Sequence, residues 1–135
     1  MRVGPELRSL VAQRAGLRCE YCLIHEDDAA FSHEVDHIVG RQHGGETTAD
    51  NLAYACMICN RFKGANISSV DAAGGIMRLF NPRSERWEDH FRLTGAVIQP
   101  LTGRGEATAR LLRFNVAERV VERNVLQRLG RYPRG

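Results

Sequence analysis

The amino-acid sequence predicts an α+β fold in which a β-rich middle lies between helical ends. Gly4-Pro5-Glu6 is a typical helix start, and apolar residues follow it at helical spacing. Short apolar segments bounded by Gly, Asn and Pro occupy the middle, as is typical of strands joined by turns. Apolar residues return to helical spacing near the end. The length of 135 residues, with 43% hydrophobic and 26% charged, suits one small globular unit and excludes a disordered, collagen-like or coiled-coil chain.

The expected elements follow from these patterns in chain order. A helix is expected over residues 5–16, because Pro5 suits the first turn and Gly16 ends the apolar periodicity. The later elements are a turn at 19–22, a strand at 31–39, a loop at 41–51, a strand at 52–55, a turn and short helix at 56–64, a strand at 76–80, a β-hairpin of 91–93 and 96–98 around Thr94-Gly95, and helices at 105–114 and 116–129. We expect a module over residues 1–70 and a C-terminal extension over residues 71–135 packed on it.

Charge is unevenly distributed along the chain. The basic residues are 18 Arg and one Lys, which favours a polyanionic partner but is also what codon bias in a GC-rich genome would produce. Residues 19–50 hold eight acidic residues and one Arg, whereas residues 101–135 hold eight Arg and three acidic residues. The acidic region suits a cation site and the basic region suits a phosphate backbone, although the Arg-rich helices could equally pack on the module.

Two features predict a cytoplasmic protein with no membrane partner. No segment approaches the roughly 20 apolar residues of a membrane span. The first residues lack the apolar run and cleavage pattern of a signal peptide. Cysteines of a cytosolic protein are expected to be reduced.

The four cysteines form two Cys-x-x-Cys pairs, and this pattern predicts a metal site. Two intervening residues let one turn present both sulfurs to the same ion, so two such turns supply four tetrahedral ligands. A site closed by four sulfurs is structural, and Zn²⁺ is the favoured ion over an iron–sulfur cluster. The ligands are Cys19, Cys22, Cys56 and Cys59.

The segment between and after these pairs carries a second pattern. Its elements are Asp36-His37-Ile38, Gly44-Gly45, Asn51-Leu52, Asn60 directly after the last Cys, and Lys63-Gly64. Over residues 19–64 this pattern resembles the HNH endonuclease family in its four-cysteine bacterial form. The resemblance implies a ββα-metal fold, with Asn60 where the family name implies His and Gly40 where Pro is common.

The chemistry of these residues fits phosphodiester hydrolysis, which needs a base for water and a cation on the phosphate. Histidine titrates near neutral pH, so His37 is the candidate base. Asp36 and Asn60 offer hard oxygen ligands that suit Mg²⁺ or Mn²⁺. Asn51 is expected to hold His37 in orientation. The resemblance implies the same four roles.

DNA is the expected substrate and partner. Side chains flanking the site are candidate phosphate contacts, namely Arg41, His43, Arg61 and Lys63. His33 is expected to face solvent rather than the site. Two alternatives to a nuclease are a non-catalytic zinc-stabilised module that binds nucleic acid, and a metal-stabilised domain that binds another protein.

Overall fold

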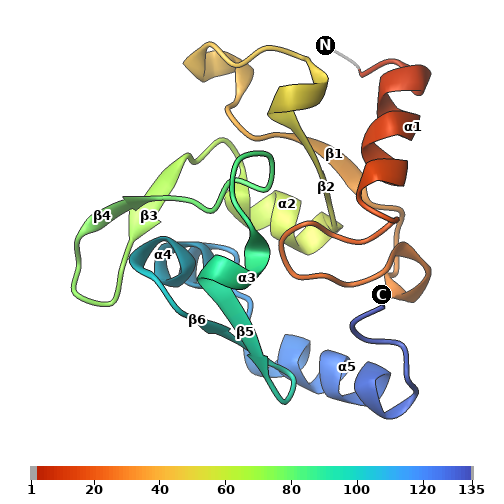
Figure 1. The fold of residues 1–135 in the computed structure, drawn as a ribbon, viewed down its shortest axis with the longest axis vertical. Coiled ribbons are helices and arrows are strands. Elements are labelled where there is room, and N and C mark those ends of the chain that lie inside the picture. The colour runs from red at the N-terminus through yellow and green to blue at the C-terminus, as the bar shows by residue number, and fades with distance from the viewer. Residues whose placement is uncertain (1–2, 135) are drawn as a thin grey trace.

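The computed structural model describes residues 3–134 and confirms the mixed α+β architecture (Figure 1). The helices and strands, in chain order, are α1 (Pro5–Arg14), β1 (Glu34–His37), β2 (Leu52–Ala55), α2 (Met57–Lys63), β3 (Ser68–Val70), β4 (Ile76–Arg78), α3 (Trp87–His90), β5 (Phe91–Thr94), β6 (Val97–Pro100), α4 (Gly103–Leu111) and α5 (Ala117–Arg128). Short 3-10 helices are η1 (Glu26–Asp28), η2 (Arg41–His43) and η3 (Ala49–Asn51).

The first half is built around the antiparallel pair β1–β2, in which His37 lies opposite Leu52. Side chains of β2 alternate between two buried faces, since successive residues of a strand point to opposite sides. Leu52 and Tyr54 pack against α1, whereas Ala53 and Ala55 join the core that contains the cysteines. In this register Asp36 lies opposite Ala53, on the face toward the cysteine core, and His37 lies opposite Leu52, on the face toward α1.

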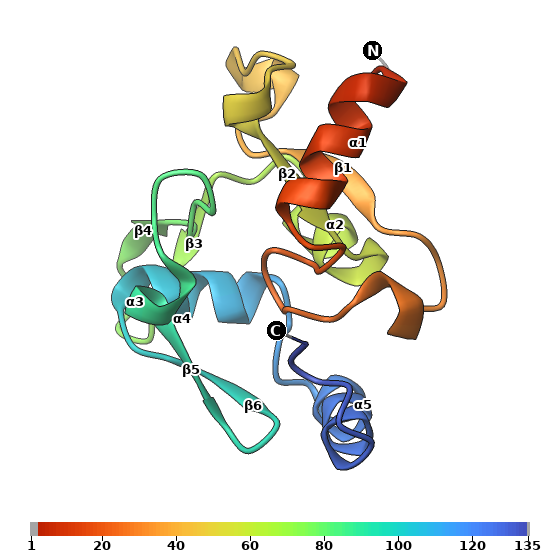
Figure 2. The ribbon, with the colours of Figure 1, turned by 45° about the vertical axis from the view of Figure 1, so that its right-hand side comes forward.

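The second half adds two antiparallel hairpins, β3–β4 and β5–β6, with α4 packed on β3, β4 and β6. Figure 2 shows α5 at the lower right, after which the C-terminal segment turns back toward the first half. The rings of Phe80, Phe91 and Phe114 pack edge to face in the same core as the four cysteines. One hydrophobic core therefore includes side chains from both halves of the chain.

Most expected elements are confirmed to within a few residues, and the differences have physical reasons. The strand expected at 31–39 is confined to β1, because Phe31 is exposed and the backbone N–H of His33 donates to the Glu26 carboxylate instead of to a strand. The sequence pattern did not indicate β3 or α3, which are only three and four residues long. No helix within residues 3–134 is long and apolar enough to cross a bilayer.

Candidate functional site

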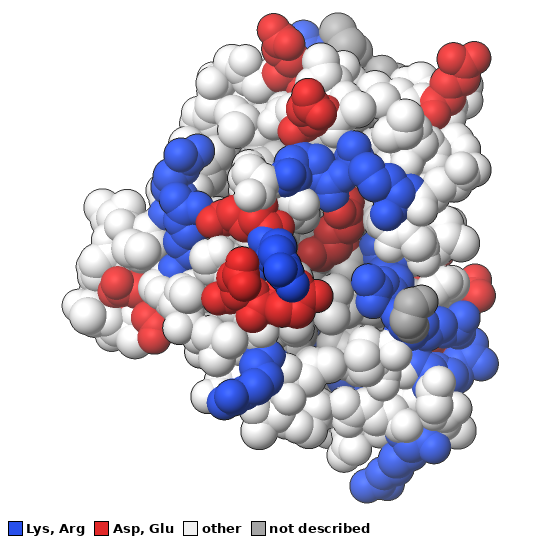
Figure 3. Space-filling view, in the orientation of Figure 1, with Lys and Arg blue, Asp and Glu red and all other residues white. Residues whose placement is uncertain are grey.

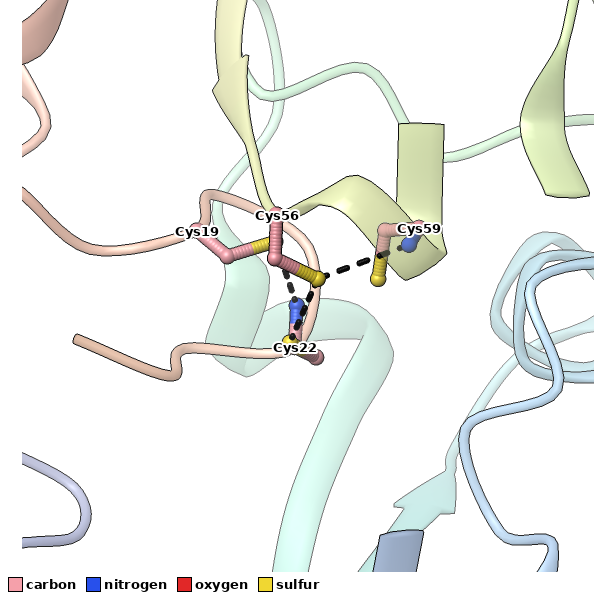
Figure 4. A group of neighbouring side chains, drawn as sticks. All are labelled: Cys19, Cys22, Cys56 and Cys59. Atoms are coloured by element: carbon pink, nitrogen blue, oxygen red, sulfur yellow. Dashed lines mark hydrogen bonds between the residues drawn. The ribbon is translucent and has the colours of Figure 1, made fainter. Parts of the chain in front are cut away.

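The four cysteines meet in the core between the two halves (Figure 4). Their sulfur atoms all lie within 4.8 Å of one another, and all four residues are buried. Each pair is a tight turn in which the second residue's N–H points at the first residue's sulfur: Cys22 N to Cys19 Sγ and Cys59 N to Cys56 Sγ are both 3.4 Å. Cys56 caps the start of α2, so the helix begins at the site.

This donor set fits a tetrahedral zinc ion. Zn–S bonds of about 2.3 Å place the sulfurs of a tetrahedral site about 3.8 Å apart, and Cys22 Sγ lies 3.7 Å from Cys56 Sγ. That separation is far beyond a disulfide bond of about 2.05 Å. Burial raises the pKa of the Cys19 and Cys59 thiols well above the ordinary value, whereas hydrogen bonds from the other cysteines lower the pKa of Cys22. A bound cation favours the thiolate form of such ligands. The cysteines are thus positioned to form a zinc site.

Asp36 and His37 end β1 and point to opposite sides of it. The half-buried His37 has its Nε2 2.9 Å from Thr47 Oγ1, in the loop between η2 and η3. Thr47 thereby fixes the orientation of the imidazole and leaves Nδ1 available to a water molecule. Sequence reasoning missed Thr47, because nothing in the spacing of the motif marks it.

Asp36 faces the interior, where it forms a buried ion pair with Lys63. Lys63 Nζ lies 3.0 Å from Asp36 Oδ2, and the same ammonium donates to the backbone oxygens of His37 at 3.1 Å and Ile38 at 3.3 Å. The Tyr21 hydroxyl donates to the same carboxylate oxygen at 3.3 Å. Burial raises the pKa of Asp36 more than Lys63 and Tyr21 lower it.

Asn60 lies on α2 and donates its side-chain N–H to the carboxylate of Glu34. Glu34 shares the face of β1 with Asp36, because the two are two residues apart on a strand. The side-chain oxygen of Asn60 makes no hydrogen bond within residues 3–134, so it is available as a ligand. The exposed Glu34 is a further oxygen donor that sequence reasoning missed, although its two-residue spacing from Asp36 could have indicated it.

Asn51 holds the loop after β1 through hydrogen bonds to its backbone. Its side chain accepts from Val39 N at 3.0 Å and donates to Val39 O at 2.9 Å and to Glu46 O at 2.8 Å. A side-chain amide carries both a donor and an acceptor, so it can mimic a strand partner for the backbone of Val39. The position of His37 therefore depends on Asn51 through the backbone.

The Gly-Gly sequence of this loop has two separate physical reasons. Gly44 has φ +87°, a left-handed conformation that favours glycine. Gly45 lies so close to the end of β1 that a Cβ would fall 1.7 Å from Val39 O. The motif thus closes the loop tightly beside His37.

The candidate phosphate contacts divide into two groups. Arg41, His43 and Arg61 are exposed, and each stays a candidate. Lys63 is only 2% exposed and its ammonium is already engaged by Asp36, which corrects its assignment as a surface contact. His33 is also fully buried rather than solvent-facing, with its Nε2 2.9 Å from Ile24 O.

The arginines of residues 101–135 mostly make contacts within the molecule. Arg119 and Arg123 are buried, while Arg131 and Arg134 pair with Asp28 and Arg104 pairs with Glu85. Acidic and basic side chains are interleaved on the face shown in Figure 3, with acidic groups gathered around α3. Basic side chains adjoin one another above this acidic group and along the right side of the view in Figure 3.

A comparison with protein-family models matches residues 19–66 to the family described as HNH endonuclease. The matched segment begins at the first cysteine and runs three residues beyond Lys63, so it contains the zinc site and every residue of the β1–α2 site described above. Comparisons with curated proteins and with solved structures gave no significant match.

Proposed function

We propose, from the match of residues 19–66 to the HNH endonuclease family, that the protein is a metal-dependent endonuclease that hydrolyses DNA phosphodiester bonds. The observation that carries the proposal is the arrangement at the end of β1. There, His37 is oriented by Thr47, and its neighbour Asp36 lies on the other face of the strand. Helix α2 lies beside β1 and presents the side-chain amide of Asn60.

His37 is the general base of the proposed reaction. Its Nε2 is engaged by Thr47, so Nδ1 is the nitrogen that would take a proton from the attacking water. Asn51 and Gly45 both contact Val39, and these contacts position the backbone that follows His37. These contacts fix the half-buried imidazole at the end of β1.

Asp36 and Asn60 are the proposed ligands of a catalytic Mg²⁺ or Mn²⁺, with Glu34 beside them. All three offer oxygen atoms, the donor type that these hard cations prefer. When bound, such a cation supplies positive charge to the oxygens of the scissile phosphate. The role of Lys63 is to hold the Asp36 carboxylate and the backbone of His37 in place.

The four-cysteine site has a structural role in this proposal, because its four sulfurs leave no position open for a substrate. It ties the turn at Cys19 to the start of α2, which carries Asn60. A cytoplasmic location suits such a site, since thiols stay reduced there. Arg41, His43 and Arg61 are exposed near the site and are the proposed contacts to the DNA backbone.

Plasmid nicking tests the proposal. Zinc-loaded protein is incubated with supercoiled DNA and Mg²⁺ or Mn²⁺, and wild type is compared with His37→Ala and Asn60→Ala. Both variants are expected to fold and to lose at least about 100-fold in cleavage rate. Gln42→Ala, at an exposed position in η2, is the matched control and should cleave like wild type.

Two outcomes would overturn the assignment. Equal nicking by wild type and His37→Ala would remove His37 from the mechanism. Salt-dependent DNA binding without cleavage under either cation would favour the non-catalytic zinc module instead.

A further inference from the structure

Arg119 brings the C-terminal extension into direct contact with the cysteine cluster. It lies on α5, about 60 residues beyond the last cysteine, and is only 7% exposed. Its Nη2 donates to Cys59 Sγ at 3.3 Å and lies 3.8 Å from Cys56 Sγ. Within residues 3–134, no other group outside the cluster donates a hydrogen bond to the Cys59 sulfur.

The other side of the same guanidinium is also engaged. Arg119 Nη1 donates to the backbone oxygen of Leu112 at 2.7 Å and to that of Arg113 at 3.3 Å. These carbonyls end α4, where unsatisfied oxygens carry partial negative charge. The planar guanidinium therefore bridges two negative sites from a fixed position.

Charge explains why an arginine is buried at this place. Four thiolates around one Zn²⁺ leave two negative charges in excess, and such charge in a buried site needs a compensating partner. Arginine keeps its proton in proteins, and the Nη2 of Arg119 lies 3.3 Å from Cys59 Sγ and 3.8 Å from Cys56 Sγ. The guanidinium is thus held in its charged form beside the sulfurs.

We propose that Arg119 is the charge partner of the zinc–thiolate centre, and that it lowers the electron density on Cys59 and Cys56 and slows their reaction with electrophiles. A hydrogen bond from a cation withdraws electron density from a thiolate and makes it a weaker nucleophile. The C-terminal extension thereby protects the metal site of the module.

Arg119 lies beside the groove through which a reagent would reach Cys56. This groove beside the cluster is lined by Ile24, Phe31, Cys56 and Arg119. The segment after α5 closes another side, because the Tyr132 hydroxyl donates to Cys22 O at 2.6 Å. Figure 1 shows the C-terminus beside the loop that carries the first cysteine pair.

Alkylation of the zinc-loaded protein by iodoacetamide tests the proposal. The attacking sulfur forms a bond to carbon, the carbon–iodine bond breaks and iodide leaves, and a zinc-sensitive dye reports the released ion. Arg119→Met keeps a long apolar stem without the charge, and its alkylation and zinc release should be about ten-fold faster. Arg128→Met, at an exposed position of the same helix, is the control and should match wild type.

A spectroscopic measurement separates this role from a purely structural one. In the Co²⁺-substituted protein, the sulfur-to-metal charge-transfer band should move to longer wavelength in Arg119→Met, because the sulfurs become more electron-rich. If that variant does not fold, Arg119→Gln decides, since it retains a donor for Leu112 O but has no charge. A folded neutral variant with wild-type alkylation rate and an unshifted band would overturn the proposal.

Discussion

The ion pair between Lys63 and Asp36 gives the sharpest stability prediction. The two side chains are 2% and 5% exposed, and their charged atoms are 3.0 Å apart. In the variant Lys63→Met, the stem of the side chain still packs but the ammonium is gone. The Asp36 carboxylate then keeps only the Tyr21 hydroxyl, and the backbone oxygens of His37 and Ile38 lose a donor.

The magnitude follows from the cost of a buried charge without its partner. Breaking a buried pair on one side destabilises by about 3–5 kcal/mol, which for a domain of this size lowers the melting temperature by roughly 10–15 °C. The double variant Asp36→Asn/Lys63→Met removes both charges. It should recover about half of the loss, since a neutral amide costs less to bury than a carboxylate.

Urea and thermal denaturation of the zinc-loaded proteins without added Mg²⁺ measure these differences. Arg61→Met, an exposed basic position on the same helix, is the control and should change the free energy of unfolding by less than about 0.5 kcal/mol. An unfolding free energy of Lys63→Met within about 1 kcal/mol of wild type, or a double variant no more stable than Lys63→Met, would contradict this role of the ion pair.

Three further predictions concern the metal, the loop and alkaline pH. Cys56→Ser should lose bound zinc and the cooperative melting transition, at a cost of several kcal/mol, as followed by circular dichroism and zinc content; a wild-type melt would contradict this. Gly45→Ala places a Cβ 1.7 Å from a backbone oxygen, so a melting temperature at least several degrees lower and slower nicking are expected. Burial raises the pKa of Tyr21, Tyr54 (to about 12) and Tyr132, the three tyrosines of the chain. Their contribution to stability is complete below the unfolded pKa of about 10 and is lost as pH rises through the folded values. A titration at 295 nm should therefore show no tyrosine ionising at pH 10 until urea unfolds the protein.

Sequence patterns predicted the parts of the site that depend on local spacing. A Cys-x-x-Cys turn places both sulfurs on one side whatever lies around it, so two such pairs indicated the cluster that the structure contains. The opposite orientations of Asp36 and His37 were likewise predictable, because adjacent residues of a strand point to opposite faces. Strand β2 was predicted with its observed bounds, since it is a short apolar run between polar neighbours.

The contacts that sequence reasoning missed are those made between distant segments. Charged side chains are usually exposed, so Lys63 was expected at the surface, and the pattern did not indicate which arginines of the C-terminal helices pack inside. Lys63 and Arg119 are buried because each meets a negative partner, the Asp36 carboxylate or the cysteine sulfurs, that the fold brings to it. The spacing of Asn51 does not reveal which backbone its side chain faces, so its contacts with Val39 were not predicted.

These contacts show where the basic residues of the C-terminal region lie in the structure. The basic excess of residues 101–135 could have indicated a DNA-binding tail, yet Arg131 and Arg134 pair with Asp28 and Arg119 contacts the cysteine cluster. Two arginines of the basic tail, Arg131 and Arg134, are thus matched to acidic residues between positions 19 and 50 of the same chain. Arginines engaged in this way release few counterions on binding DNA, so the salt dependence of binding should reflect mainly the exposed Arg41 and Arg61 near the site. The C-terminal residues then act on residues 19–66 by completing their core and contacting the cysteine cluster.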